Sequence, residues 1–204
     1  MLLTSGMSAR GAGEPVPQAV LDSAEAATKI LGQQVMKGDF TFALKRMYPR
    51  WRKRAAVRAG GDAQLVKKLM TVPQQMKEQG IDLLEFEVGQ ARSGHEVFLG
   101  RGKVKGTQEP VQMYLEWLVF VPTRKVYRVI DPATRQPKKL ELKGYQVAIA
   151  RKPFLEDPPL KQPNWYFIDG SSLTIPDLRS FFPGLPEDQA LLGLPPVGGG
   201  ELKN

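Results

Sequence analysis

The sequence predicts an α+β fold in which N-terminal helices pack on one face of a curved antiparallel sheet. Two observations predict it. Apolar residues recur at a helical spacing of about 3.6 up to Gly80 and at a strand spacing of about 2 after it. The second observation is the run of residues 165–169 late in the chain, which predicts a closing strand. In a strand, Trp165, Phe167 and Asp169 would point to one side and Tyr166 and Ile168 to the other.

The first helix is expected to begin at Pro17, because proline suits the N-terminus of a helix. Its apolar residues fall at steps of three and four and form one stripe: Val20, Ala24, Ala27, Leu31 and Val35. Gly38 ends the helix. Because its apolar residues form one stripe, we expect this stripe to face the sheet.

Two more helices are expected before the sheet. Asp39 is a favourable N-cap for the second, and Tyr48-Pro49 closes it. The third begins near Asp62, and Pro73 should kink or divide it.

The strands are expected over residues 81–88, 96–105, 111–121, 125–130 and 140–150, before the closing strand. The third has the most continuous apolar face, formed by Val111, Met113, Leu115, Trp117, Val119 and Val121. His95 lies in the turn before the second of these strands and is expected at the surface.

These elements divide the chain into three parts. Residues 1–16 form a flexible leader that resembles the end of a secretory signal. Residues 17–170 form a single domain, and residues 171–204 form a Pro- and Gly-rich C-terminal extension ending in a loose Gly-rich tail. The leader favours export to a bacterial envelope or periplasm, with the cytoplasm as the alternative.

The composition excludes several kinds of site. The chain has no cysteine, so it has no disulfide, thiol nucleophile or thiolate metal site. With a single histidine it cannot build a multi-histidine metal site, and its carboxylates are scattered, so we expect no metal and no cofactor. No apolar run approaches the roughly 20 residues that cross a bilayer.

The chain resembles the nuclear transport factor 2-like superfamily, whose members share a cystatin-like α+β cone. The resemblance rests on the order of the elements, on Lys37-Gly38-Asp39-Phe40 and Gln79-Gly80-Ile81, and on the closing strand, residues 165–170. It implies a bacterial member of this superfamily with a pocket between the helices and the curved sheet. The hairpin around residues 122–142 and the tail from residue 171 are additional to that pattern, and no catalytic residues of the enzymatic members can be carried across.

Three side chains are candidates for the pocket. Tyr114 and Glu116 share one strand face, where a phenol beside an acid can transfer protons. The alternative is that this face is the outer or dimer-forming side of the sheet. Asp169 aligns with the aromatic residues of the closing strand, although an aspartate before a glycine is also typical of a turn.

The net charge is +8, and the most basic window spans residues 45–58. Cationic side chains lie beside an indole in this window, and this combination suits contact with an anionic polymer or surface. The candidate residues for anion binding are Arg50, Trp51, Arg52, Lys53 and Arg54. The alternative is a solvent-exposed surface that binds no partner, with Trp51 packed against the core. No nucleic-acid-binding motif accompanies the charge, so no specific nucleic acid is expected.

The sequence therefore favours a non-enzymatic binding or interaction module with an unidentified small ligand or protein partner, or a homodimer formed through the sheet. A small-molecule lyase or isomerase of the same fold, using Glu116 or Asp169, is one alternative. An anion binder acting through residues 45–58 is the other.

Overall fold

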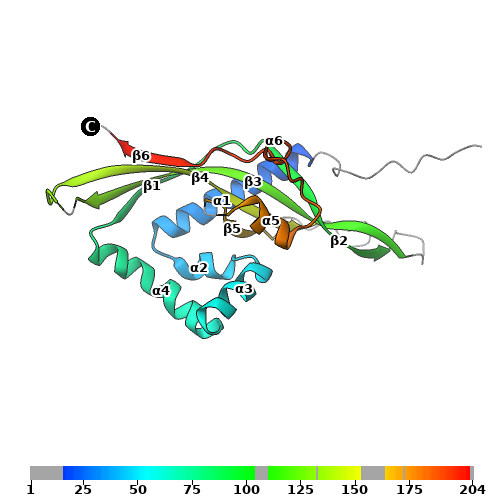
Figure 1. The fold of residues 1–204 in the computed structure, drawn as a ribbon, viewed down its shortest axis with the longest axis horizontal. Helices are drawn as coiled ribbons and strands as arrows, with labels where there is room; N and C mark the ends of the chain where they lie inside the picture. Colours follow the sequence, from blue (N-terminus) through cyan, green and yellow to red (C-terminus); the bar gives the residue numbers. More distant parts are fainter. Residues whose placement is uncertain (1–15, 104–109, 132, 153–163, 172, 203–204) are drawn as a thin grey trace, which may run out of the picture.

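The computed structural model describes residues 16–103, 110–131, 133–152, 164–171 and 173–202. Apart from Val16, the expected leader lies outside these residues. The described residues confirm the α+β fold, with helices beside a curved, unclosed antiparallel sheet of six strands (Figure 1). In chain order the elements are α1 (Gln18–Met36), α2 (Phe40–Lys45), α3 (Pro49–Ala59), α4 (Asp62–Glu78), β1 (Asp82–Val88), β2 (Ser93–Lys103), β3 (Pro110–Ile130), β4 (Pro137–Arg151), β5 (Tyr166–Asp169), α5 (Ile175–Phe181), α6 (Gln189–Leu192) and β6 (Gly198–Leu202).

The first two helices lie where the sequence places them. Pro17 precedes α1, and the expected stripe supplies its buried residues Val20, Ala24 and Leu31. The Asp39 carboxylate caps α2 by accepting a hydrogen bond from the backbone N–H of Phe42 at 3.0 Å. All four N-terminal helices lie on the same side of the sheet (Figure 1).

A helix that we did not expect, α3, occupies most of the basic window. Pro49 stands in its first turn, where a missing N–H costs nothing, and Gly60 ends it with a left-handed φ of 90°. The next helix, α4, runs through Pro73, so the proline does not divide it. Arg52 joins the two helices by donating two hydrogen bonds to Asp62, at 2.8 and 2.7 Å.

A long hairpin of β3 and β4 forms the centre of the sheet, and its pairing extends from Glu116 opposite Arg151 to Ile130 opposite Pro137. β1 and β2 lie end to end along the other edge of β3. β5 and β6 lie end to end along the other edge of β4. The two strands expected over 111–121 and 125–130 are therefore one continuous strand, β3.

Pro122 lies inside β3, although a proline normally removes a hydrogen bond from a central strand. The pairing explains why it is tolerated. Val88 of β1 pairs with Thr123 and Ser93 of β2 pairs with Phe120, so the edge is interrupted opposite the proline. The Pro122 carbonyl faces this gap and accepts a backbone hydrogen bond there, so the missing N–H falls where the ladder is already broken.

Both faces of the sheet are covered at its centre. On the helical face, α1 packs over residues that point from the middle strands, among them Val119, Val121, Ala148 and Ala150. The opposite face is covered by the C-terminal segment, whose buried residues are Leu178, Phe181, Phe182, Leu185 and Leu192. The segment that we treated as an extension thus forms a third layer, and the expected loose tail at Gly198 is instead strand β6.

We expected His95 in a surface turn, but it lies in strand β2. Its Nε2 lies 3.1 Å from the carbonyl oxygen of Leu192, and its ring meets the ring of Phe120 edge-on. The expectation was wrong because the sequence did not show that α6 returns over this strand.

Candidate ligand-binding site

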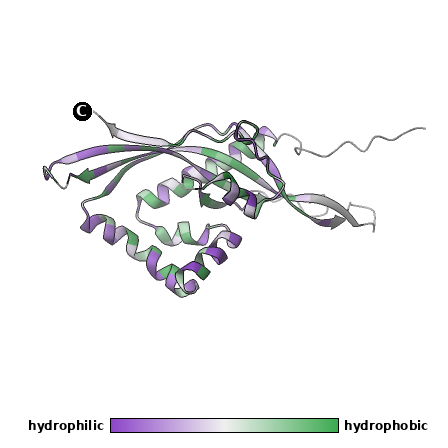
Figure 2. Cartoon of the chain, in the orientation of Figure 1, coloured by the Kyte–Doolittle hydropathy of each residue, from purple (hydrophilic) through white to green (hydrophobic). Residues whose placement is uncertain are grey.

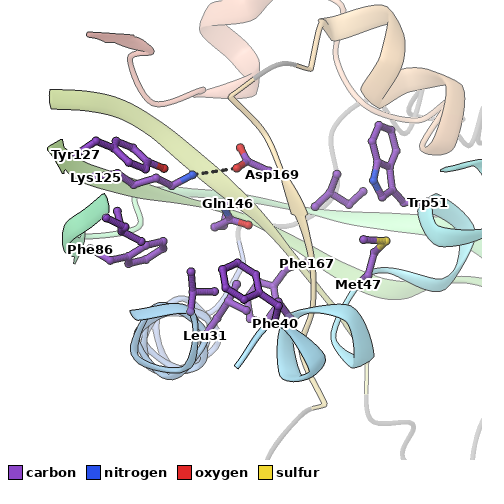
Figure 3. Close-up of a pocket in the computed structure, with 14 residues that line it drawn as sticks. Leu31, Phe40, Met47, Trp51, Phe86, Lys125, Tyr127, Gln146, Phe167 and Asp169 are labelled. Atoms are coloured by element: carbon purple, nitrogen blue, oxygen red, sulfur yellow. Dashed lines mark hydrogen bonds and ion pairs between the residues drawn. The ribbon is translucent and has the colours of Figure 1, made fainter. Parts of the chain in front are cut away.

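A pocket of about 290 Å³ lies between α1, α2, the start of α3 and the curved sheet (Figure 3). Most of its wall is apolar or aromatic. The lining residues are Leu31, Val35, Phe40, Ala43, Met47, Trp51, Leu83, Phe86, Lys125, Tyr127, Gln146, Phe167, Ile168 and Asp169.

The aromatic wall depends on a close approach between α1 and β1. Gly32 is buried inside α1, and the ring of Phe86 lies so near that a Cβ at this position would collide with it. Glycine therefore lets the Phe86 ring lie against the helix, while Phe40 and Phe167 line the pocket from α2 and β5. Aromatic side chains supply large apolar contact areas, so this wall suits an apolar group.

The polar side chains of the pocket come from the sheet. Lys125 of β3 donates a hydrogen bond to the Asp169 carboxylate of β5 at 2.9 Å (Figure 3). Desolvation opposes the ionisation of Asp169, but the Lys125 charge and hydrogen bonds from Ser171 outweigh it, so the pKa of Asp169 is lowered. The Asp169 carboxylate is therefore ionised at neutral pH. The Lys125 side chain is 15% exposed and the Asp169 side chain is 53% exposed.

Gln146 is the most informative residue of the pocket. It lies in β4 opposite Asp169, is only 6% exposed, and lines the cavity. Within the described residues its side-chain amide makes no hydrogen bond, nor does the hydroxyl of Tyr127 nearby. The amide opens into the cavity, where it is free to exchange hydrogen bonds with a bound molecule.

The three pocket candidates are separated by the sheet. Asp169 lines the pocket, whereas Tyr114 and Glu116 do not. Glu116 lies on the face that the C-terminal segment covers, where it accepts a hydrogen bond from the Tyr48 hydroxyl at 2.9 Å. Burial raises the pKa of Glu116, against the Tyr48 hydrogen bond and the charges of two arginines. Tyr114 lies on the same face, near Gly184 in the loop after α5.

In the basic window, several candidates for anion binding have contacts within the protein. Arg50 donates to the carbonyl oxygen of Phe181 at 3.1 Å, and Arg54 donates to Ser180 Oγ at 2.7 Å. Trp51 packs against the Phe181 ring, with the ring centroids 5.6 Å apart.

Arg52 and Lys53, the other two candidates of the window, differ in their contacts within the protein. The donors of Arg52 are used by Asp62 in the link between α3 and α4. Lys53 is exposed and has no hydrogen bond or ion pair within the described part of the chain.

We did not identify Phe86, Lys125, Tyr127 or Gln146 from the sequence. Only Gln146 carries a usable signal, because it is a polar residue inside an otherwise small or apolar run, residues 144–150. Phe86 belongs to the apolar side of its strand, which indicates burial but not a pocket, and Lys125 and Tyr127 lie at exposed-looking positions. The curvature of the sheet brings them together.

Among residues 16–103, 110–131, 133–152, 164–171 and 173–202, no group of three or more histidine or acidic side chains is placed to hold a metal ion. In that same part of the chain, no helix has the length and apolar character needed to cross a membrane. Comparisons with family models, with curated proteins and with solved structures found no match.

Proposed function

We propose that the protein is a non-enzymatic binding module that holds a small amphipathic molecule in the pocket between its helices and its sheet. The observation that carries this proposal is the Gln146 amide, which has no hydrogen-bond partner among the described residues and opens into a mostly apolar cavity. A cavity with a mostly apolar wall and a few convergent polar groups is typical of small-molecule sites.

The lining indicates the chemistry of the ligand. Several rings line the cavity, which favours an apolar, preferably cyclic, body. Among these rings the Gln146 amide and the Tyr127 hydroxyl can each donate and accept hydrogen bonds. Lys125, whose Nζ lies 5.9 Å from the centroid of the Phe86 ring, can still donate to a ligand although it is paired with Asp169. The ligand is therefore expected to carry an oxygen-rich polar or anionic group, and a volume near 290 Å³ limits it to a compact molecule.

Binding is favoured over the alternative, a lyase or isomerase, by the state of the carboxylates. A general base works best with a pKa near the operating pH, whereas Lys125 holds the pKa of Asp169 low. Glu116 has a raised pKa but lies outside the pocket. The helix-then-sheet order and the pocket support the proposed membership of the nuclear transport factor 2-like superfamily, which is an argument from fold alone.

The test uses 1-anilinonaphthalene-8-sulfonate, a fluorescent probe with an aromatic body and an anionic group. We expect saturable binding of one probe per chain with enhanced fluorescence. Ala43 lines the pocket, so Ala43→Trp should fill it and reduce the affinity at least about tenfold. The matched control is Ala26→Trp, on the exposed side of α1 at a different hollow, and it should bind like the wild type.

Far-ultraviolet circular dichroism and thermal melts of both variants check that they remain folded. Equal loss of probe binding in both variants, or unchanged binding in Ala43→Trp, would contradict the proposed site. A direct search for the natural ligand is native mass spectrometry of the protein purified from its own cells, where a bound small molecule should appear as a constant mass increment absent from Ala43→Trp.

A further inference from the structure

The net positive charge of this protein is concentrated in one helical hairpin. From Pro49 to Glu78, α3 and α4 carry eight basic and two acidic residues, which accounts for six of the eight net charges of the chain. The rest of the chain is almost balanced. The hairpin projects from the sheet, and hydrophilic residues recur along both of its helices (Figures 1 and 2).

The two helices share a cationic hollow of about 260 Å³. Arg54 and Arg58 of α3 and Lys68 of α4 lie around it, and the rest of its lining is Trp51, Ala55 and Ala59. The hollow is thus lined by three cationic side chains together with an indole and two alanine side chains. Anionic groups with an adjoining apolar part fit such a surface.

An acidic side chain also lies near the two arginines of the hollow. Asp177 of α5 lies close enough for Arg54 and Arg58 to help lower its pKa, after the larger effect of its hydrogen bonds with Thr174. Arg54 is also held by Ser180 at 2.7 Å. Arg58 and Lys68 have no hydrogen bond or ion pair within the described residues, so their charges are available to a partner.

A large apolar side chain stands exposed on α3, where Val57 is 77% exposed. Met70 of α4 is 47% exposed, but its sulfur contacts Thr41 of α2 on the side of the helix away from the hollow. At 100° per residue, Val57 falls between Lys53 and Arg58 on the helical wheel of α3. Apolar side chains set among cations are typical of helices that lie on a membrane surface, where they enter the boundary between headgroups and acyl chains.

We propose that the α3–α4 hairpin docks on the surface of an anionic phospholipid bilayer, with lipid phosphates around the hollow and Val57 directed at the lipid. A nucleic acid fits these residues less well, because single strands are bound largely by stacking on free aromatic rings. Tyr48 is 3% exposed, and Trp51 is packed on Phe181. The proposal does not depend on the ligand pocket.

The test is co-sedimentation of the full chain with vesicles of phosphatidylcholine containing about 30% phosphatidylglycerol, compared with pure phosphatidylcholine. We expect binding to the anionic vesicles alone, weakening as salt rises because screening shortens the range of the attraction. Each basic residue near an anionic surface contributes about fivefold in affinity. A variant with glutamine at Lys53, Arg58, Lys67 and Lys68, all exposed, should therefore lose more than about 100-fold.

A matched control removes four exposed charges elsewhere, by placing glutamine at Lys29, Lys37, Arg92 and Lys139. Both variants have the same net charge, so a general charge effect would weaken them equally and overturn the proposal. We expect the control to retain most of its binding. The change Val57→Ser removes apolar surface and leaves the charge unchanged, so it should weaken vesicle binding severalfold.

Three other results would overturn the proposal: no binding of the wild type to anionic vesicles, equal binding to neutral vesicles, or tighter binding to a DNA duplex or to heparin than to the vesicles at the same salt concentration. The pocket variant Ala43→Trp should still bind vesicles. Vesicle binding and probe binding therefore fail independently, and circular dichroism confirms that each variant is folded.

Discussion

Replacing Gln146 by methionine should make the protein more stable. The residue is 6% exposed, and its amide has no hydrogen-bond partner in the described part of the chain. Leaving such a group unpaired costs about 1–3 kcal/mol. Because the amide faces a cavity of about 290 Å³, which is large enough for water molecules, we take the lower end of that range.

Methionine has a similar length and no branch at Cβ, so it should pack against the apolar wall with little strain. We therefore expect a gain of about 1 kcal/mol in the free energy of unfolding, which for a chain of this size raises the melting temperature by about 2–4 °C. Urea denaturation at pH 7 measures the first quantity and calorimetry the second. The matched control is Gln33→Met on the exposed side of α1, which should change stability by less than about 0.5 kcal/mol.

A loss of stability of about 1 kcal/mol or more in Gln146→Met would refute this reasoning. It would mean that the amide is well hydrogen-bonded in the folded protein, through water held in the cavity. The pocket would then be a hydrated structural site, and its unpaired amide would no longer argue for a ligand. A gain of stability would instead mark a residue kept at some cost to the fold, as is common at functional sites.

Three further predictions concern the sheet and its turns. Trp117→Ala should cost about 3 kcal/mol in urea denaturation, whereas Trp117→Phe should cost less than about 1 kcal/mol, because the indole N–H that it removes has no partner within the described residues. Burial raises the pKa of Glu116, so its ionisation opposes folding and stability should fall as the pH rises above 4.5; Glu116→Gln, which can still accept from Tyr48, should remove that fall between pH 4 and 7, and an unchanged pH profile would contradict the raised pKa. The ion pair with Lys138 and backbone hydrogen bonds lower the pKa of Asp131 to about 2, so Asp131→Ala should destabilise the β3–β4 turn above about pH 4, and its difference from the wild type should shrink as the pH falls through about 2.

The sequence predicted those helices whose apolar residues form a stripe. α1 and α2 follow from such a stripe and from the Asp39 cap, and the strands follow from their alternation. α3 was missed because it carries mostly arginine, lysine and alanine and has no continuous apolar face. Its end signals, Pro49 in the first turn and Gly60 after the last, are local and would have identified it.

The candidate site was harder to predict because alternation gives the two faces of a strand but not what covers each face. Tyr114 and Glu116 do share a face, yet it is the one that lies under the C-terminal segment. Asp169 lines the pocket because it continues the aromatic face of β5. Lys125 and Gln146 join it only through the pairing of three strands, a long-range property that no local pattern contains.

The return of the chain from β5 through α5 and α6 to β6 has a consequence for biosynthesis. The middle strands present Phe120, Tyr145 and Val147 to a layer that comes, among the described residues, mostly from positions later than 170, with Tyr48 and Trp51 as earlier contributors. While the ribosome extends the chain, most of this apolar surface therefore has no cover until residues 173–192 have emerged. Uncovered sheet surface of this kind promotes aggregation, so the nascent chain should depend on chaperones most during that interval. A chain terminated within it should accumulate as insoluble protein.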